Sequence, residues 1–501
     1  MASSPTLQRI ATDSSLALLF RILHVAMGYL TTLAIARYYG AGTMGTYYIA
    51  LSLAQTIWTF CCLGLNTGLL RFVAVLKSAG KNAELRQLFW TAVKVVALLG
   101  CIAGVALWGL GHRLAESFHS PNLPSVLNFM ALWLPLGLVG ALLSETVRAL
   151  GGVRWTVLFQ DTISPAFFLF LILVFAYAGP NLISPEKALG LAYLSLAFLG
   201  LGFLALLQQS RRFLIAPAPG LLHGTETGSP PLKELIRYSW PLFLTSILWL
   251  YSAGLDSLVL GYFSSPEIVA YYGAAARTAL LVSFPLLAVN AVVSPLFAQY
   301  HEQGNLEGLG MVSQTTARWM YLVALPLALL LILLGPELLR LFGPDFPKAR
   351  FAMSALVMAQ LVNVAVGSVG YLLMMTGNQW TLLVMQIIIG VGIIPIIVVS
   401  GAFFGLNGVA LASASGIVLI NILMAWGVWR RLKIKSYARG VTWANLGAFL
   451  GIALFFLSKP YLGVLGGATL FAFGYLTMAG KTLAQEIRNI FGLSQSVRAI
   501  R

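Results

Sequence analysis

Charged residues are scarce in this sequence. Only 9% of the 501 residues are Asp, Glu, Lys or Arg, whereas 59% are hydrophobic, and the mean hydropathy is +0.87. A soluble chain carries about a quarter of its residues as charges, so this chain has too little polar surface for a water-soluble fold. Its apolar stretches are long enough to cross a hydrocarbon core of about 30 Å. Because they are continuous and do not alternate with polar residues, we expect membrane helices rather than barrel strands.

Cysteines and nucleotide-binding motifs are scarce as well. Cys61, Cys62 and Cys101 all lie in apolar stretches, and we interpret them as small buried side chains rather than as a disulfide framework or a metal site. The stretch GYLTMAGKT, which ends at Thr482, imitates a phosphate-binding loop. Its glycines are too far apart by one residue, and it ends a membrane helix instead of following a strand. We therefore expect no nucleotide-driven machinery.

The apolar stretches predict about fourteen membrane-spanning helices, with boundaries good to about two to four residues. In chain order they cover residues 15–36, 46–68, 88–110, 123–146, 155–178, 188–208, 239–262, 270–297, 317–335, 351–375, 381–400, 406–429, 441–457 and 461–480. The last two are short and flank Lys459 and Pro460. Without this pair the count is twelve.

The distribution of basic residues predicts the orientation of these helices. With the N-terminus in the cytoplasm, 21 of the 31 Lys and Arg residues fall in cytoplasmic segments, 7 in outer segments and 3 within spans. This bias is the one that membrane proteins show toward the cytoplasm. We therefore predict a multi-pass protein of the cytoplasmic (inner) membrane with both termini in the cytoplasm. The net charge of +16 has the same explanation, and we expect no nucleic-acid partner.

A polar stretch divides the chain after the sixth span. Residues 208–240 contain four prolines and basic residues at both ends, which indicates a cytoplasmic linker. We predict an all-α fold with an N-terminal six-helix lobe over 1–208, a linker over 209–238, a C-terminal six-helix lobe over 239–429, and two extra helices with a cytoplasmic tail over 430–501.

The two halves resemble each other. YYGAGTMGTYY, which ends at Tyr48, and YFSSPEIVAYY, which ends at Tyr272, each join one span to the next. The same offset of 224 residues relates Tyr48 to Tyr272, Asn66 to Asn290, and Gly80 to Gly304. Repeats with an even number of spans are parallel, and transporters built in this way bind substrate between the repeats.

Two segments resemble a known family. ARYYGAGTMGTYYIALSLA, followed by LGLNTGLLRFVA, is similar to the polysaccharide-biosynthesis flippases, whose superfamily includes the multidrug and toxin extrusion (MATE) transporters and the lipid II flippases. AYYGAAARTALLVSFPLLAVNAVVSPLFAQ resembles the matching segment of the second half. The resemblance covers most of residues 15–300. The positions that carry it are Arg37, Gly40, Gly45, Tyr47, Gly64, Leu65, Arg71, Phe72, Tyr272, Ala276, Arg277, Pro295 and Ala298.

The resemblance implies two lobes around a V-shaped cavity, alternating access, and a lipid-linked oligosaccharide or related anionic glycolipid as cargo for cell-surface polysaccharide biosynthesis. The sugar and its pyrophosphate would cross in the cavity while the polyprenyl tail stays in lipid. The expected partners are this substrate, membrane lipids, and polysaccharide polymerase or export machinery. We expect a transporter that is not an enzyme and has no cofactor; the sequence leaves the coupling ion, Na⁺ or H⁺, unidentified.

Arg21 and His24 are candidate cavity residues. They lie three residues apart in the first span and therefore share one helix face. A guanidinium group suits a phosphate, so Arg21 is a candidate phosphate ligand. Alternatively, Arg21 extends to the interface. His24 is interpreted as a packing or hydrogen-bonding group.

Further polar residues lie inside the predicted spans. Arg277 is a candidate substrate ligand, and it could instead form an ion pair with Asp256 at similar depth. Asn66 and Asn290 are candidate cavity residues, or they bond neighbouring helices. Lys94 and Asp161 lie near the cytoplasmic ends of their spans, where interfacial positions are expected. Asp161 is the best candidate for a coupling carboxylate.

Two other functions remain open. A multidrug or cation antiporter of the same superfamily would use cavity carboxylates, for which Asp161 and Asp256 are candidates. A membrane-embedded glycan polymerase or ligase needs a large outer loop, but the longest outer loop, near residues 336–350, is short.

The GxxxG pairs Gly100/Gly104 and Gly447/Gly451 indicate close helix packing.

Overall fold

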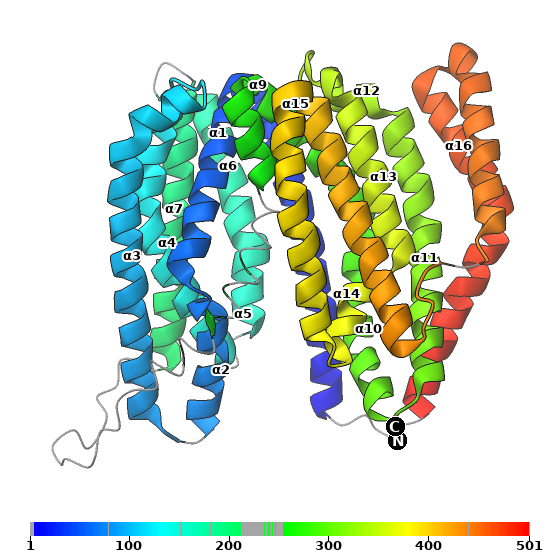
Figure 1. Cartoon of the computed structure of the whole chain (residues 1–501), viewed down its shortest axis with the longest axis horizontal. Helices are drawn as coiled ribbons and strands as arrows, with labels where there is room; N and C mark the ends of the chain where they lie inside the picture. Colours follow the sequence, from blue (N-terminus) through cyan, green and yellow to red (C-terminus); the bar gives the residue numbers. More distant parts are fainter. Residues whose placement is uncertain are drawn as a thin grey trace. The chain divides into compact units, whose positions relative to one another are not determined.

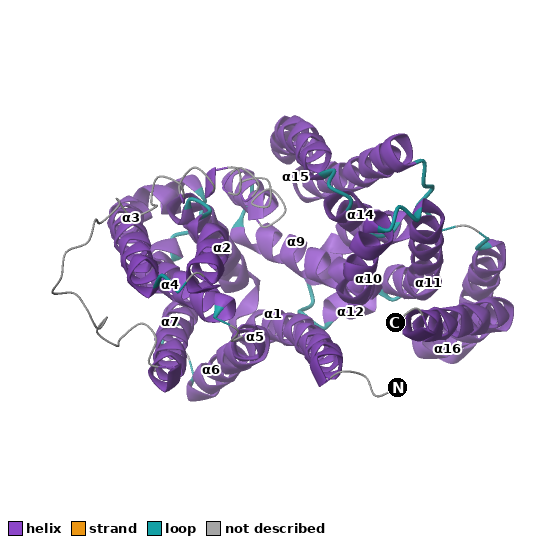
Figure 2. Ribbon diagram, turned by 90° about the horizontal axis from the view of Figure 1, so that it is seen from below, coloured by secondary structure: helices purple, strands orange, loops and turns teal. Residues whose placement is uncertain are grey.

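The computed structural model describes residues 5–78, 80–150, 153–179, 183–211, 254–438 and 440–499, together with isolated positions between 235 and 246. In this part of the chain every regular element is helical (Figure 2). The all-α prediction is therefore confirmed. The predicted linker and most of the span over 239–262 lie outside the described residues.

The helices belong to two compact units, Met1–Ala270 and Tyr271–Arg501. The first contains α1 (Pro5–Cys62), α2 (Leu65–Ser78), α3 (Asn82–Ser117), α4 (Leu123–Ala149), α5 (Val153–Leu158), the π-helix η1 (Phe159–Ile163), α6 (Ser164–Ala178), α7 (Pro185–Arg211) and a short helix over Gly254–Phe263. α9 (Pro266–Ala279) crosses the division. The second unit continues with η2 (Leu280–Ser283), α10 (Phe284–Glu302), α11 (Leu306–Leu333), α12 (Gly335–Arg340), η3 (Phe346–Ala349), α13 (Arg350–Val366), α14 (Val369–Met375), α15 (Gln379–Leu432) and α16 (Thr442–Ala499).

Three helices are too long for one membrane crossing. α1 and α16 have 58 residues each and α15 has 54, so each would extend roughly 80 Å or more as a straight rod. Each contains one glycine with non-helical angles: Gly40 (φ 84°), Gly405 (φ 53°) and Gly463 (φ 70°). Figure 1 shows the two halves of α15 side by side. Gly40 and Gly405 fall between predicted spans, whereas Gly463 is the third residue of the predicted span over 461–480.

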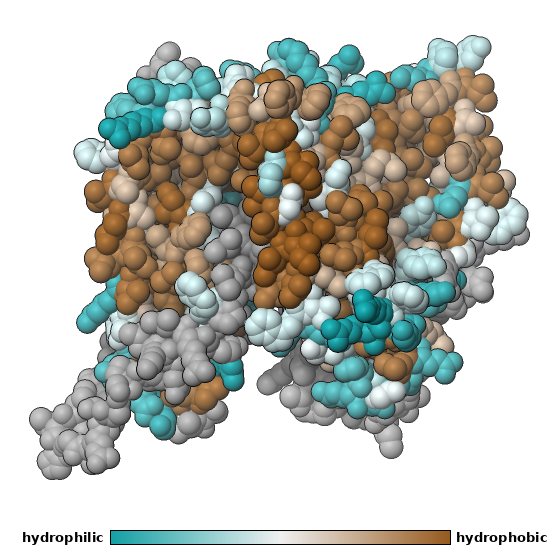
Figure 3. Space-filling view, in the orientation of Figure 1, coloured by the Kyte–Doolittle hydropathy of each residue, from teal (hydrophilic) through white to brown (hydrophobic). Residues whose placement is uncertain are grey.

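Seven described helices, or eight if the bent pair of α1 and α2 counts as one span, are long and apolar enough to cross a membrane. α15 and α16 are counted once each in that number. The face in Figure 3 shows hydrophobic side chains over the middle of α3 and α15 and hydrophilic ones at the helix ends. The chain is a polytopic helical membrane protein.

The predicted span over 46–68 contains a break in its helix. α1 ends at Cys62, and α2 leaves at an angle of 46°. Leu63 (φ 48°) and Gly64 (φ 70°) form the break, where glycine adopts positive φ without steric cost. The prediction that all three cysteines are buried was wrong for Cys101, which is exposed. Cys101 lies on the outward apolar face of α3, beside the exposed Ile102 and Val105.

The repeat seen in the sequence is also present in the backbone. α2 and α10 end 224 residues apart, as do the starts of α3 and α11. Gly80 (φ 73°) and Gly304 (φ 68°) follow the ends of α2 and α10. The capping hydrogen bonds repeat with the same offset: Gly80 N to Lys77 O at 3.1 Å and Lys81 N to Leu76 O at 3.0 Å, then Gly304 N to His301 O and Asn305 N to Tyr300 O, both at 3.0 Å.

Both GxxxG pairs lie at close helix contacts, as predicted. A Cβ on Gly104 would lie 2.6 Å from the carbonyl oxygen of Ala131 in α4. A Cβ on Gly451 would lie 2.8 Å from the carbonyl oxygen of Phe471, in the other half of α16. Backbones at this distance leave no room for a side chain. The domain boundaries at 208, 238 and 429 stay a prediction.

Candidate functional site

The first unit holds Arg21 and His24 in one uninterrupted stretch of α1. The helical backbone puts them on one face, as the spacing predicts. The side chain of His24 is exposed, whereas the side chain of Arg21 lies outside the described residues. Their role in binding cargo stays a prediction.

Arg277 and Asn290 lie in the second unit. Arg277 is exposed in the last turn of α9, where the helix dipole favours a cation. The side-chain oxygen Oδ1 of Asn290 in α10 is buried and has no hydrogen-bond partner among the described residues. Asp256 is half-buried on the helix Gly254–Phe263 in the first unit. The proposed pairing of Asp256 with Arg277 stays a prediction.

The two repeated asparagines differ in their relation to the helix breaks. Asn66 is the second residue of α2, directly after the break at Leu63 and Gly64. Asn290 lies seven residues after η2, the 3₁₀ segment that interrupts the predicted span over 270–297. Both side chains are partly buried.

Lys94 is exposed on α3, so it points away from the core of the first unit.

A π-helix, η1, gathers polar groups that the sequence did not single out. Gln160 Nε2 donates to Ser144 Oγ at 2.8 Å. Thr162 Oγ1 and Gln55 Oε1 are buried without a hydrogen-bond partner in the described part of the chain, and α1 packs against η1. Asp161 is the middle residue of η1, and its side chain lies outside the described residues. Single turns of π-helix often occur at functional sites.

These uncharged residues gave no signal in the sequence because they carry no charge and match no motif. Only the fold brings α1, α4 and η1 together. Side-chain oxygens of amides and hydroxyls are ligands for hard cations. Among the described residues, no group of three His, Cys, Asp or Glu side chains could hold a metal ion.

A second polar cluster in the first unit surrounds Glu186, at the start of α7. Glu186 is 9% exposed, and its Oε1 accepts from Thr43 Oγ1 at 3.0 Å and from Asn122 Nδ2 at 3.2 Å. Nearby in sequence, the Tyr39 hydroxyl donates to the carbonyl of Ile172 at 2.8 Å. Burial raises the pKa of Tyr39 to about 12, so this donor keeps its proton at physiological pH.

Aromatic rings from four helices form a column inside the first unit. Trp58 stacks on Trp133 with ring centroids 4.8 Å apart, and Trp133 lies 4.9 Å from Tyr193. Tyr193 contacts Tyr47 and Phe168 with centroids 6.3 and 5.9 Å apart. Such contacts add about 0.5–1.5 kcal/mol each beyond area burial. The column fixes α1, α4, α6 and α7 against one another.

Sequence comparisons connect this arrangement to known proteins. The family described as polysaccharide biosynthesis protein matches residues 10–301, and the MatE family matches residues 241–400. The probable flippase AglR of Haloferax volcanii is 24% identical over 51% of this chain and 56% of its own length. The uncharacterized membrane protein EpsK of Bacillus subtilis is 29% identical over 30% of this chain and 32% of its own length. The matches thus cover about a third of the length of EpsK and a little over half of the length of AglR.

Solved structures share the fold. An inward-facing MATE multidrug resistance transporter of the MOP superfamily has a TM-score of 0.70 at 14% identity, covering 84% of this chain and 99% of that chain. The lipid II flippase MurJ in an inward closed conformation has a TM-score of 0.69 at 14% identity, covering 94% and 100%. At 14% identity these two matches show that the fold is shared. Since the polysaccharide biosynthesis match extends over more than half of the sequence, this chain belongs to the polysaccharide biosynthesis protein family of multi-pass membrane proteins.

Proposed function

We propose that this protein is a flippase for a polyprenyl-(pyro)phosphate-linked oligosaccharide or a related anionic glycolipid. It moves this cargo from the cytoplasmic to the outer leaflet for cell-surface polysaccharide synthesis. Family membership over residues 10–301 is the observation that carries the proposal. The partial match to a protein named as a probable flippase supports it.

The charge distribution favours an anionic cargo over a cationic one. Of the fifteen acidic residues, only Glu486 follows Asp345. The spans predicted from residue 317 to residue 480 therefore contain no carboxylate at all. A cation carried through the second half would have no negative side chain from these spans. Arg21 and Arg277 are then the ligands for the phosphate groups.

In this mechanism the headgroup and its phosphates enter between the two repeats while the protein is open to the cytoplasm. Arg21 and Arg277 bind the phosphates, and the polyprenyl tail stays in lipid. Rocking of the repeats then exposes the cargo to the outer side. Transport is driven by an ion gradient or the membrane potential, with the η1 cluster and Asp161 as the coupling site for Na⁺ or H⁺. Polymerase or export machinery would receive the flipped product.

A multidrug antiporter is the second candidate function. The MatE match over residues 241–400 favours it, and Asp161 and Asp256 would then contact a cationic drug.

Lipid analysis of the host distinguishes the two functions. Cells lacking the protein are complemented with wild type, Arg21→Ala or Arg113→Ala, and polyprenyl-linked oligosaccharides are quantified by mass spectrometry. Arg113 is an exposed arginine on α3 and serves as the matched control. We expect accumulation of the glycolipid without the protein, clearance by wild type and Arg113→Ala, and at least tenfold weaker clearance by Arg21→Ala. Unchanged glycolipid levels together with sensitivity to cationic dyes would instead establish the antiporter.

A further inference from the structure

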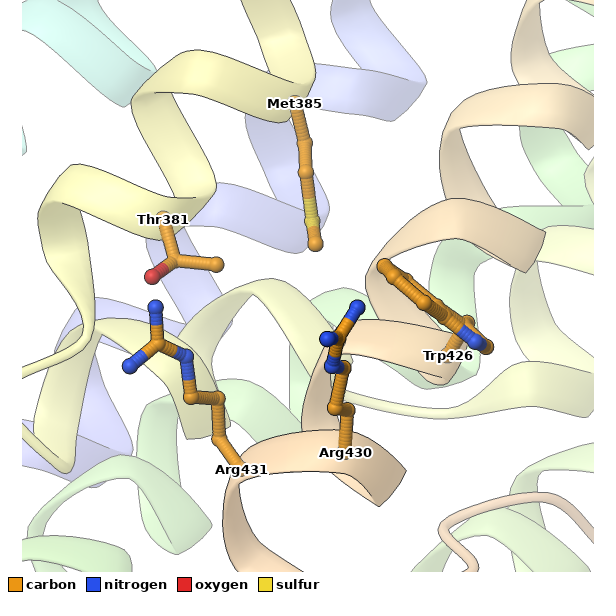
Figure 4. Close-up of a pocket in the computed structure, with 6 residues that line it drawn as sticks. Thr381, Met385, Trp426, Arg430 and Arg431 are labelled. Atoms are coloured by element: carbon orange, nitrogen blue, oxygen red, sulfur yellow. The ribbon is translucent and has the colours of Figure 1, made fainter.

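The second unit contains a pocket that none of the predicted site residues lines. Its volume is about 420 Å³, and it lies between the beginning and the end of α15 (Figure 4). The lining residues are Thr381, Met385, Trp426, Gly427, Arg430 and Arg431. Figure 4 shows both guanidinium groups rising from the end of α15 toward Thr381 and Met385. The ring of Trp426 lies beside Arg430, 5.1 Å from its guanidinium carbon.

Within the described part of the chain, the helices that pack against α15 supply no carboxylate to neutralise the positive charge of this pocket. α13 and α14 pack against α15, and neither they nor α15 contain Asp or Glu. Two guanidinium groups at one helix end repel each other, and an anion between them is attracted by both. Arginine offers forked pairs of N–H donors, a geometry that fits phosphate oxygens.

The start of α15 adds donors of its own. Thr381 is the third residue of the helix, and its hydroxyl lies at the pocket. Asn378, the residue before the first residue of α15, does not cap the helix with its side chain. Its Nδ2 instead donates to the carbonyl of Thr376 at 3.1 Å. Uncapped N–H groups of a first turn favour an anion.

Exposed tryptophans place the pocket at the depth of lipid headgroups. Trp380 is 67% exposed, Trp426 44% and Trp429 46%, and exposed Trp side chains gather at the membrane–water interface. Further along α15, the exposed side chains become aliphatic, among them Val384, Ile388 and Val391. A ligand with a phosphate in the pocket can therefore lay its hydrocarbon chain along this face.

We propose that this pocket binds the phosphate ester of a membrane lipid. Arg430 and Arg431 hold the phosphate oxygens, the Thr381 hydroxyl donates to one of them, and the apolar chain packs on α15. Two lipids carry this chemistry, an anionic glycerophospholipid and a polyprenyl phosphate. The predicted topology puts this end of α15 on the cytoplasmic side. The proposal does not depend on the flippase function.

Native mass spectrometry of the purified full-length protein tests the site. The probes are phosphatidylglycerol, polyprenyl phosphate and, as a zwitterionic control, phosphatidylcholine. We compare wild type with R430Q/R431Q and with R113Q/R340Q, which removes the same charge from exposed positions elsewhere. We expect R430Q/R431Q to lower retention of at least one anionic lipid about tenfold or more, with R113Q/R340Q near wild type. The lipid that is lost identifies the source of the phosphate.

Thr381→Val gives a milder test, with an expected loss of a few-fold in retention of the same lipid. Melting temperature and gel filtration establish that each variant is folded. The proposal is wrong if folded R430Q/R431Q retains both anionic lipids as wild type does. It is equally wrong if wild type retains phosphatidylcholine as strongly as it retains phosphatidylglycerol and polyprenyl phosphate.

Discussion

Glu186 illustrates how a single side chain joins three helices of the first unit. It lies in the first turn of α7, where a negative charge complements the helix dipole. Its oxygen Oε1 accepts hydrogen bonds from Thr43 in α1 and from Asn122, the residue before α4. Removing the carboxylate leaves both donors without this acceptor in a site that is largely closed to solvent.

We expect Glu186→Ala to lower the free energy of unfolding by about 2–4 kcal/mol, since each lost hydrogen bond to a charged group costs roughly 1.5–3 kcal/mol and losses are not additive. Glu116→Ala, at an exposed position of α3, should change it by no more than about 0.5 kcal/mol. Thermal unfolding in detergent measures both. Equal melting temperatures for the two variants would show that the Glu186 contacts contribute no net stability.

At the scale of elements, helix contacts depend on glycines that face a neighbouring backbone. Gly104 and Gly109 lie on the same helix, α3, but their surroundings differ. A Cβ on Gly104 would lie 2.6 Å from Ala131 O, whereas a Cβ on Gly109 would meet no atom within 4 Å. Alanine substitutions at these two positions therefore test helix packing and helix propensity separately.

We expect Gly104→Ala to destabilise the protein by about 1–3 kcal/mol, because α3 and α4 must move apart. Gly109→Ala should be neutral or stabilising by up to about 1 kcal/mol, since alanine is the better helix former. Melting temperatures of the two variants give the comparison. A Gly104→Ala variant as stable as Gly109→Ala would mean that α3 and α4 are not in contact there.

At the scale of the whole molecule, the predicted topology has definite consequences for accessibility. Glu307 and Asp345 are both exposed in the second unit. The distribution of basic residues predicts that Glu307 faces the cytoplasm and that Asp345 faces the outside. In a background with Cys61, Cys62 and Cys101 replaced by alanine, a membrane-impermeant thiol reagent applied to intact cells should label Asp345→Cys and leave Glu307→Cys unlabelled. Labelling after cell lysis confirms that both cysteines are reactive. The opposite pattern would invert the topology and place both termini outside.

The fold class, most helix boundaries and the internal repeat follow from the sequence alone. Hydropathy is a local property, and a lipid-exposed helix needs about twenty apolar residues, so span positions follow from composition alone. The repeated Gly80 and Gly304 show that cap geometry is local too, because a positive φ is encoded by the glycine. The family resemblance was readable because it rests on contiguous segments.

The contacts between polar groups, in contrast, depend on how the helices pack. Ser144 and Gln160, or Thr43 and Glu186, come from different helices, and no spacing rule relates them. The break at Leu63 could not be predicted, since leucine ordinarily continues a helix and its positive φ (48°) depends on neighbouring contacts. In the sequence, Arg430 and Arg431 are two of the basic residues that predict the orientation of the helices. They line a pocket with Thr381 because α15 folds back at Gly405, which brings residues about fifty positions apart to one end of the helix pair.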